Sequence, residues 1–253
     1  MTDSWTVVGA WGPFPAPGGA LRGHLLRQVG AAALLVGCGS GISGRLEYHL
    51  PEWQELGAVL LPDLHPAHAA DLHALGSRCA SMAVRGARRG LLPVYAPMDD
   101  PAFAALGRPG VLDPRAVAAG NESRVGGWHV RWHATASGGL AVRLRGAAGT
   151  AAFIPAGGVD PALATFVAGV GLLVVECGDP DGEASAEDVL ASARRAGELA
   201  REAAVDALLL SHLEPTVGVE PTVAAARDAF PRAQCALEGR TYDLPTDSAN
   251  SQG

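Results

Sequence analysis

Short apolar runs separated by Gly and Pro recur through the first part of the chain. They cover residues 5–9, 22–27, 32–37, 57–62 and 91–97. Short apolar runs bounded by turn-forming residues are typical of buried strands. This part of the chain is therefore predicted to supply one group of strands.

The middle of the chain changes to an alternating pattern. Residues 128–137 and 139–146 alternate apolar and polar side chains, and residues 150–156 follow after a Gly-containing turn. Such alternation predicts an antiparallel meander with one face on the core. Residues 171–177 and 207–215 are mostly apolar throughout, which predicts two further buried strands.

Three segments have helical spacing, at residues 68–87, 185–203 and 220–230. The strands thus fall into two groups, each followed by helices. This order favours a two-sheet α/β arrangement over one doubly wound sheet. We expect one domain over residues 1–244 and a disordered polar tail over residues 245–253.

Composition limits the classes of partner. The net charge is −7 and the basic residues are scattered along the chain, which argues against nucleic-acid binding. No apolar run is long enough to span a membrane, and no basic segment precedes an apolar stretch at the N-terminus. The expected location is the cytoplasm.

Lysine and cysteine usage limit the catalytic mechanisms and the metal sites that are possible. All nineteen basic residues are Arg, so mechanisms that need a lysine amine are excluded. The four cysteines are widely separated and form no CxxC pair, so a cysteine-based zinc site is not expected. These cysteines are Cys38, Cys79, Cys177 and Cys235.

Three short motifs could carry chemistry. Residues 39–44 (GSGISG) match the G-x-G-x-x-G pattern of cofactor-binding turns, but Asp63 is the one carboxylate at the expected distance. Ser211 and His212 adjoin at a strand end without the elbow of a hydrolytic triad. Residues 63–68 (DLHPAH) place two histidines and a carboxylate within six residues, as metal sites do.

The third motif stands in a recognisable order of segments. PAPGGALRGHLL, ALLVGCGSGISGRL, GAVLLPDLHPAHAADL, the meander and ALLLSHLEP follow one another along the chain. This order resembles the ribonuclease Z-like branch of the metallo-β-lactamase-fold hydrolases, over roughly residues 5–242. The resemblance implies an αββα sandwich of two mixed β-sheets flanked by helices. It also implies two metal ions that activate a hydroxide against phosphodiester, ester or lactam bonds.

Four positions of the family's H-x-H-x-D-H motif fall on this segment. The first histidine is replaced by Asp63, and the second is kept as His65. The aspartate is replaced by Ala67, and the last histidine is kept as His68. The motif therefore keeps two of its four residues.

The family's remaining ligand positions are also mixed. The late histidine is kept as His212, whereas the carboxylate of the family's Gly-Asp-Thr turn is replaced by Ala156. The acid that usually precedes the Cys-Gly-Ser-Gly turn is replaced by Gly37. The family also has a histidine in the meander. His133 lies close to that position in the sequence, but the better register places Thr135 at it.

These losses change the predicted chemistry. Two divalent ions need anionic ligands to offset their repulsion, and Asp63 is the only replacement anion. We therefore expect no dinuclear site. Without metal, acid–base chemistry is expected in a cleft whose catalytic residues are Asp63, His65, His68 and His212.

The alternatives remain open at this point. Asp63, His65 and His133 (or His129) could hold a single divalent ion of zinc, manganese or iron, as in a mononuclear phosphodiester or ester hydrolase. A non-catalytic pseudoenzyme acting through partners is the third hypothesis. The expected partner is a small-molecule ligand, and a homodimer is compatible with the sequence. The residues expected to contact the ligand are His133, Trp132 and Glu176.

Overall fold

A computed structural model describes residues 2–98, 103, 110–157, 160–177 and 185–244. The predicted tail at 245–253 lies outside the described residues. Seven strands form the first sheet, in the order β14-β1-β2-β3-β4-β5-β6. They are β1 (Ser4–Gly9), β2 (Gly23–Arg27), β3 (Ala33–Val36), β4 (Leu56–Leu60), β5 (Leu92–Pro97), β6 (Leu112–Val117) and β14 (Thr241–Asp243).

Seven strands also form the second sheet, in the order β13-β12-β11-β10-β9-β8-β7. They are β7 (Glu122–Val125), β8 (Trp128–Ala134), β9 (Leu140–Arg145), β10 (Thr150–Ile154), β11 (Leu172–Glu176), β12 (Ala207–Ser211) and β13 (Gln234–Cys235). Strands β7 to β10 pair antiparallel, and β10 to β13 pair parallel. The first sheet is mixed in the same way, since β3 to β6 pair parallel while β1 pairs antiparallel with β2 and β14.

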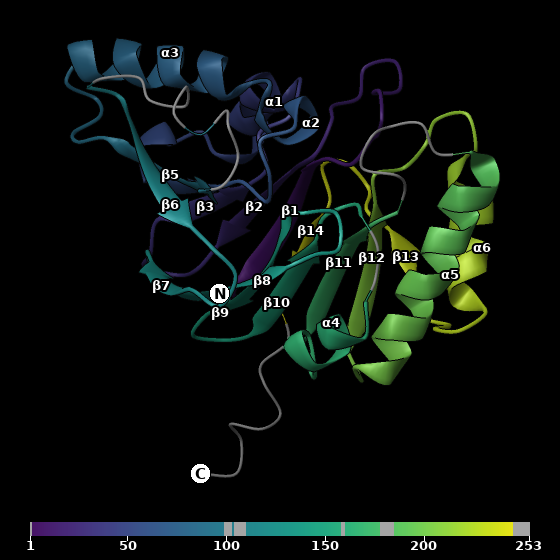
Figure 1. Ribbon diagram of the computed structural model, residues 1–253. Coiled ribbons are helices and arrows are strands. Elements are labelled where there is room, and N and C mark those ends of the chain that lie inside the picture. Colours follow the sequence, from purple (N-terminus) through teal and green to yellow (C-terminus); the bar gives the residue numbers. More distant parts are fainter. Residues whose placement is uncertain (1, 99–102, 104–109, 158–159, 178–184, 245–253) are drawn as a thin grey trace.

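Helices cover the outer face of each sheet, so the chain forms four layers (Figure 1). The helices on the first sheet are α1 (Ile42–His49), α2 (Pro66–Ala69) and α3 (Leu72–Val84), with a 3₁₀ turn at Trp53–Glu55. Those on the second are α4 (Pro161–Phe166), α5 (Ala186–Glu202) and α6 (Val219–Arg227). The predicted sandwich of two mixed sheets flanked by helices is confirmed. None of the helices described combines the length and apolarity that a membrane crossing needs.

One core joins the two sheets. Trp5 and Leu34 from the first sheet belong to the same buried cluster as Trp128, Phe153 and Leu173 from the second. Alternation explains this packing, because Trp128, Val130 and Trp132 of β8 are buried while the residues between them are partly or fully exposed. The assignment of residues 1–244 to one domain stays a prediction.

The glycine-rich motif at residues 39–44 has a packing role. A Cβ atom on Gly39 would lie 2.1 Å from the carbonyl oxygen of Ala67, so only glycine allows this turn to touch α2. Asp71 accepts a hydrogen bond from the backbone N–H of Ser43 at 2.9 Å. It lies between α2 and α3, into which the predicted 68–87 helix is divided. The turn therefore positions α2, which contains His68 and directly follows His65.

Candidate functional site

The chemically distinctive residues meet where strands of both sheets end. Asp63 and His68 follow β4, Glu176 is the last residue of β11, and His212 follows β12. Arg22 immediately precedes β2, whose first residues lie beside the end of antiparallel β3. The carboxyl ends of parallel strands commonly form binding sites in α/β folds. The five side chains define what we call the Arg22 cluster.

Local hydrogen bonds build the turn that aims His68 inward. Asp63 Oδ1 accepts from the backbone N–H of His65 at 3.0 Å, and His65 Nδ1 accepts from that of Ala67 at 3.3 Å. Pro66 occupies the first helical position of α2, where its missing N–H costs nothing. As a result the His68 side chain is fully buried, whereas His65 is exposed.

His68 lies between two carboxylates. Its Nδ1 is 2.7 Å from Asp63 Oδ1, and its Nε2 is 3.0 Å from Glu176 Oε1. Burial alone would lower the pKa of His68, but the negative charges of Glu176 and Asp63 outweigh it and raise the pKa to about 9. At neutral pH His68 is therefore an imidazolium that donates to a carboxylate from each nitrogen.

Arg22 is the second buried cation of the cluster. Its Nη1 is 3.1 Å from Glu176 Oε2, and its Nη2 lies 2.8 Å from His212 Nδ1 and 3.0 Å from Nε2. The Arg22 side chain is 3% exposed and that of Glu176 is not exposed at all. A buried charge is stable only when it is paired, and here Arg22 and Glu176 pair with each other.

Glu176 receives three partners. Besides Arg22 and His68, the backbone N–H of Ala156 donates to its Oε2 at 2.9 Å. Burial would raise the pKa of this carboxyl group, but the charges of Arg22 and His68 hold it well below its usual range. Glu176 is thus a carboxylate whose two oxygens are both occupied.

His212 remains neutral. Burial and the neighbouring Arg22 guanidinium lower its pKa to about 3, so a ring nitrogen can accept from Arg22. The backbone of Gly12 approaches the ring closely, because a Cβ atom on Gly12 would lie 1.8 Å from His212 Cδ2. His212 is therefore held between a guanidinium and a backbone segment that only glycine can form.

The structure separates the other predicted residues from this cluster. His133 stacks on Phe166 of α4, with ring centroids 5.0 Å apart, on the outer face of the second sheet. Trp132 points to the opposite face and is buried in the core. Neighbouring residues of a strand face opposite sides, so His133 and Trp132 lie on different faces of β8. Their contact with a ligand stays a prediction.

Thr135 and Asp63 both lie beside Gly139. A Cβ atom on Gly139 would lie 3.5 Å from Thr135 Oγ1 and 3.6 Å from Asp63 Oδ2. Metal binding by Asp63, His65 and His133 stays a prediction. Among the residues that the structure describes, no group of three His, Cys, Asp or Glu is placed to hold a metal ion.

The side chains present fit a guanidinium better than a metal. A metal ion needs deprotonated ligands with free lone pairs. Both nitrogens of His68 face carboxylates, and both nitrogens of His212 lie against Arg22. The positions of the family's carboxylates are the buried methyl groups of Ala67 and Ala156, which cannot coordinate.

Sequence reasoning missed Arg22 and underrated Glu176. Each is a charged residue inside an otherwise apolar run, in ALRGHLL and LLVVEC respectively. Such residues are almost never fully buried unless paired, so two isolated opposite charges in two buried runs were a usable signal.

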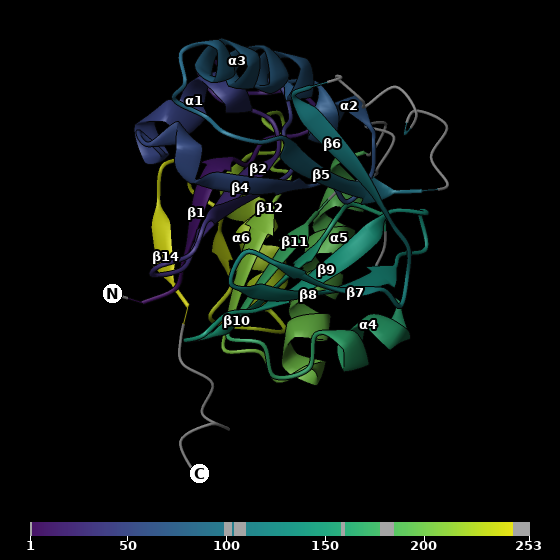
Figure 2. The ribbon, with the colours of Figure 1, turned by 90° about the vertical axis from the view of Figure 1, so that its left-hand side faces the viewer.

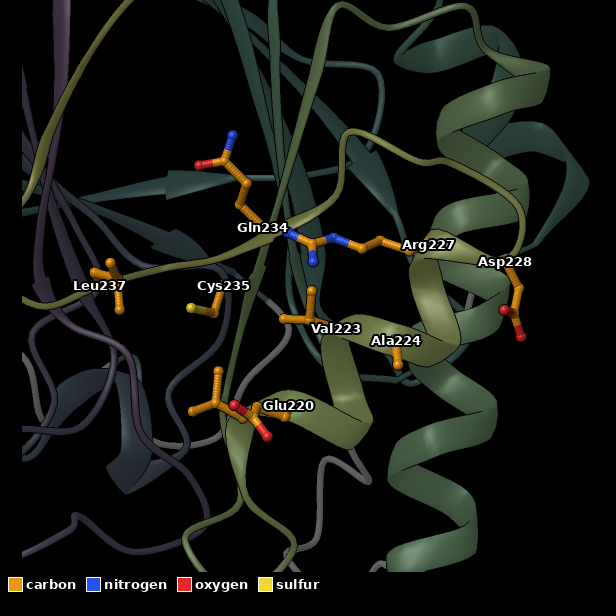
Figure 3. Close-up of a pocket in the computed structure, with 9 residues that line it drawn as sticks. Glu220, Val223, Ala224, Arg227, Asp228, Gln234, Cys235 and Leu237 are labelled. Carbon is orange, nitrogen blue, oxygen red and sulfur yellow. The ribbon is translucent and has the colours of Figure 1, made fainter.

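A pocket elsewhere in the described part of the chain has different chemistry. It measures about 750 Å³ and lies between α6 and β13 (Figure 3). Its walls include Val223, Cys235 and Leu237, and its charged residues Glu220 and Asp228 are exposed. None of the predicted site residues lines this pocket, so the Arg22 cluster remains the candidate site.

Comparison with known proteins agrees with this architecture. The crystal structure of YhfI from Bacillus subtilis superposes with a TM-score of 0.84 at 24% identity, covering 96% of this chain and 100% of YhfI. The chain has the metallo-β-lactamase fold. Zn²⁺-bound PqqB from Methylobacterium extorquens shares this fold with a TM-score of 0.74 at 14% identity, covering 95% and 100% of the two chains. The short form of human tRNase Z gives 0.69 at 13% identity, covering 96% and 99%.

Sequence similarity within the metallo-β-lactamase fold is more restricted. No family model matches the chain. The curated sequence of YhfI from Bacillus subtilis (strain 168), described as a probable metallo-hydrolase, is 37% identical over 90 residues. This match spans 36% of this chain and 36% of YhfI. Relatives in this fold thus include a protein described as a probable metallo-hydrolase and a zinc-bound protein.

Proposed function

We propose that this protein acts without metal on a small molecule, as a binder or an enzyme, and that the Arg22 guanidinium replaces metal ions as the central cation. One observation carries the proposal: buried Arg22 contacts Glu176, and His212 as well, at hydrogen-bond distance. A divalent ion beside this guanidinium would meet strong repulsion in a site shielded from water. The dinuclear site of the fold is, on this proposal, lost.

The charge balance of the cluster supports the proposal. Arg22 and His68 carry one positive charge each, and Asp63 and Glu176 carry one negative charge each. His212 is neutral. Buried charges are tolerated when they are paired, and the formal charges of this set balance without a further ion.

The open side of the cluster is the place for a ligand. The Asp63 side chain is 26% exposed and His65 is exposed, whereas the other members are buried. Within the described part of the chain, Asp63 Oδ2 has no hydrogen-bond donor. We assign ligand contact to Asp63 and His65, and a positioning role to His68, Glu176, Arg22 and His212. His68 holds Asp63 as an oriented carboxylate that can accept a proton or a hydrogen bond.

Hydrolysis assays test this proposal against the mononuclear alternative, which the names of the relatives favour. We expect the protein to cleave bis(p-nitrophenyl) phosphate and p-nitrophenyl acetate no faster with Zn²⁺ or Mn²⁺ than with EDTA. In EDTA, replacing Asp63 by Asn should reduce ester turnover by roughly 100-fold, as expected for loss of an acid–base group.

The control for this assay is Asp113→Asn in β6. It makes the same replacement of a carboxylate oxygen by an amide nitrogen, at a partly exposed side chain. It should leave turnover unchanged. Hydrolysis that depends on added metal and disappears in Asp63→Ala would refute the metal-free proposal and support a mononuclear hydrolase. Inactivity under both conditions would instead support the non-catalytic alternative.

A further inference from the structure

The outer face of strands β7 to β9 carries a grid of basic residues. Strand register aligns the residues in two neighbouring rows that cross the three strands. The first row is Glu122, Arg131 and Arg143, and the second row is Arg124, His129 and Arg145. Four of the nineteen arginines that look scattered in the sequence therefore gather at this face, which we call the arginine face.

This face is positively charged, although the protein as a whole is acidic. Four arginines accompany one glutamate here, although the whole protein has a net charge of −7. Arg131 and Arg143 are directly opposite each other on adjacent strands. Like charges in this arrangement destabilise a sheet unless an anion lies between them. The register thus places a repulsive pair where a ligand could neutralise it.

A cavity lies over the arginine face, beside the C-terminal end of α4. Its volume is about 430 Å³, within the usual range for small-molecule sites. Arg131, Arg143 and Arg145 line it together with His129 and Glu122. Figure 2 shows α4 next to the end of the sheet that contains β7, β8 and β9. Three guanidinium groups therefore line one hollow of small-molecule size.

Fixed contacts hold two of the three arginines that line this hollow, Arg143 and Arg131. Arg143 Nη1 donates to the carbonyl oxygens of Phe166 at 2.7 Å and Ala168 at 3.0 Å. Glu122 accepts from Arg131 Nε at 2.9 Å, which leaves the terminal nitrogens of Arg131 for a ligand. Arg145 is exposed, and in the described part of the chain it forms no ion pair. Preorganised donors reduce the entropy lost on binding.

We propose that the arginine face binds a small phosphate ester or pyrophosphate group through Arg131, Arg143 and Arg145. Guanidinium groups bind phosphate oxygens in pairs, and several of them suit an anion with three or more acceptor oxygens. A long nucleic acid is disfavoured because the acidic remainder of the molecule would repel it. This site is separate from the Arg22 cluster and does not depend on the function proposed for it.

Calorimetric titration with inorganic pyrophosphate and AMP tests this proposal. Replacing Arg131 and Arg145 together by Gln should weaken binding of either probe by roughly 30-fold or more, because each loses a charged hydrogen bond. The control is Arg89→Gln, an exposed arginine after α3, which alters net charge without touching the cavity. It should change affinity by less than about twofold through long-range charge alone.

Two results would overturn the proposal. One is that pyrophosphate and AMP bind the wild type no better than they bind the double variant. The other is that a single-stranded RNA binds tightly while neither small probe binds, which would make the face a nucleic-acid surface. Thermal unfolding verifies that the double variant folds, and its Tm without ligand should equal or exceed that of the wild type because repulsion is relieved.

Discussion

Replacing Arg22 by Ala destabilises the protein by about 3–5 kcal/mol, because Glu176 is left as a buried carboxylate without its main counter-ion. His212 also loses its hydrogen-bond donor in this variant. The loss is measured from urea unfolding curves at neutral pH, followed by the fluorescence of the buried tryptophans. A loss this large exceeds the effect of most single substitutions.

Two further variants make this result specific. Arg89→Ala removes an exposed arginine and should change the free energy of unfolding by less than about 0.5 kcal/mol. Combining Arg22→Ala with Glu176→Gln should recover part of the lost stability, because the uncompensated charge is removed as well. A cost below about 1 kcal/mol for Arg22→Ala, in the range of exposed ion pairs, would contradict the central role of this residue.

The second large effect is a decline in stability at alkaline pH. The pKa of His68 is raised in the folded protein from 6.5 to about 9, so its stabilising contribution is fully present below pH 6.5. That contribution is lost as the pH rises through about 9. The free energy of unfolding should fall across this window by roughly 3 kcal/mol. Urea unfolding at a series of pH values measures it.

His68→Gln is the matched control for the pH series. This variant is less stable at neutral pH, but its stability should change much less between pH 6.5 and 9, since the titrating group is gone. Burial raises the pKa of the Cys38 and Cys177 thiols, which weakens both proteins equally at the alkaline end. Parallel pH profiles for wild type and variant would show that His68 is not a buried imidazolium.

The sandwich was predictable because its central strands are continuously apolar or strictly alternating. The runs at residues 32–37 and 171–177 correspond to β3 and β11, and the alternation at 128–137 corresponds to β8. The edge strands β6, β7 and β14 escaped prediction. β6 contains Pro114 and an exposed Arg115, since an edge strand is half-solvated and lacks the continuous apolar pattern of a central one.

The site was predictable only in part. The segment DLHPAH and the late His212 are local signals, and the structure brings Asp63, His68 and His212 together. Arg22 and Glu176 lie 154 positions apart in the sequence, so their pairing depends on how the two sheets face each other. For His133, sequence alone could not settle the side of β8 on which it lies, because that side changes with every single position. Contacts that cross the two sheets are not encoded in any local pattern.

The same structure explains why a histidine-rich motif can survive without its carboxylates. In the Arg22 cluster, His68 and His212 hold Glu176, Asp63 and a guanidinium in place rather than presenting free lone pairs. Asp63 keeps the one partly exposed carboxylate of the cluster. On the function proposed above, the retained histidines have a physical role that requires no metal ion.

Elemental analysis tests the central claim most directly. The protein would be purified without a metal-affinity tag, incubated with zinc, manganese or iron, dialysed, and analysed by mass spectrometry alongside Asp63→Ala. We predict far less than one ion per chain in both proteins, and an unfolding temperature that EDTA does not change. One or more tightly held ions per wild-type chain, lost in Asp63→Ala, would contradict the claim that Arg22 replaces the metal.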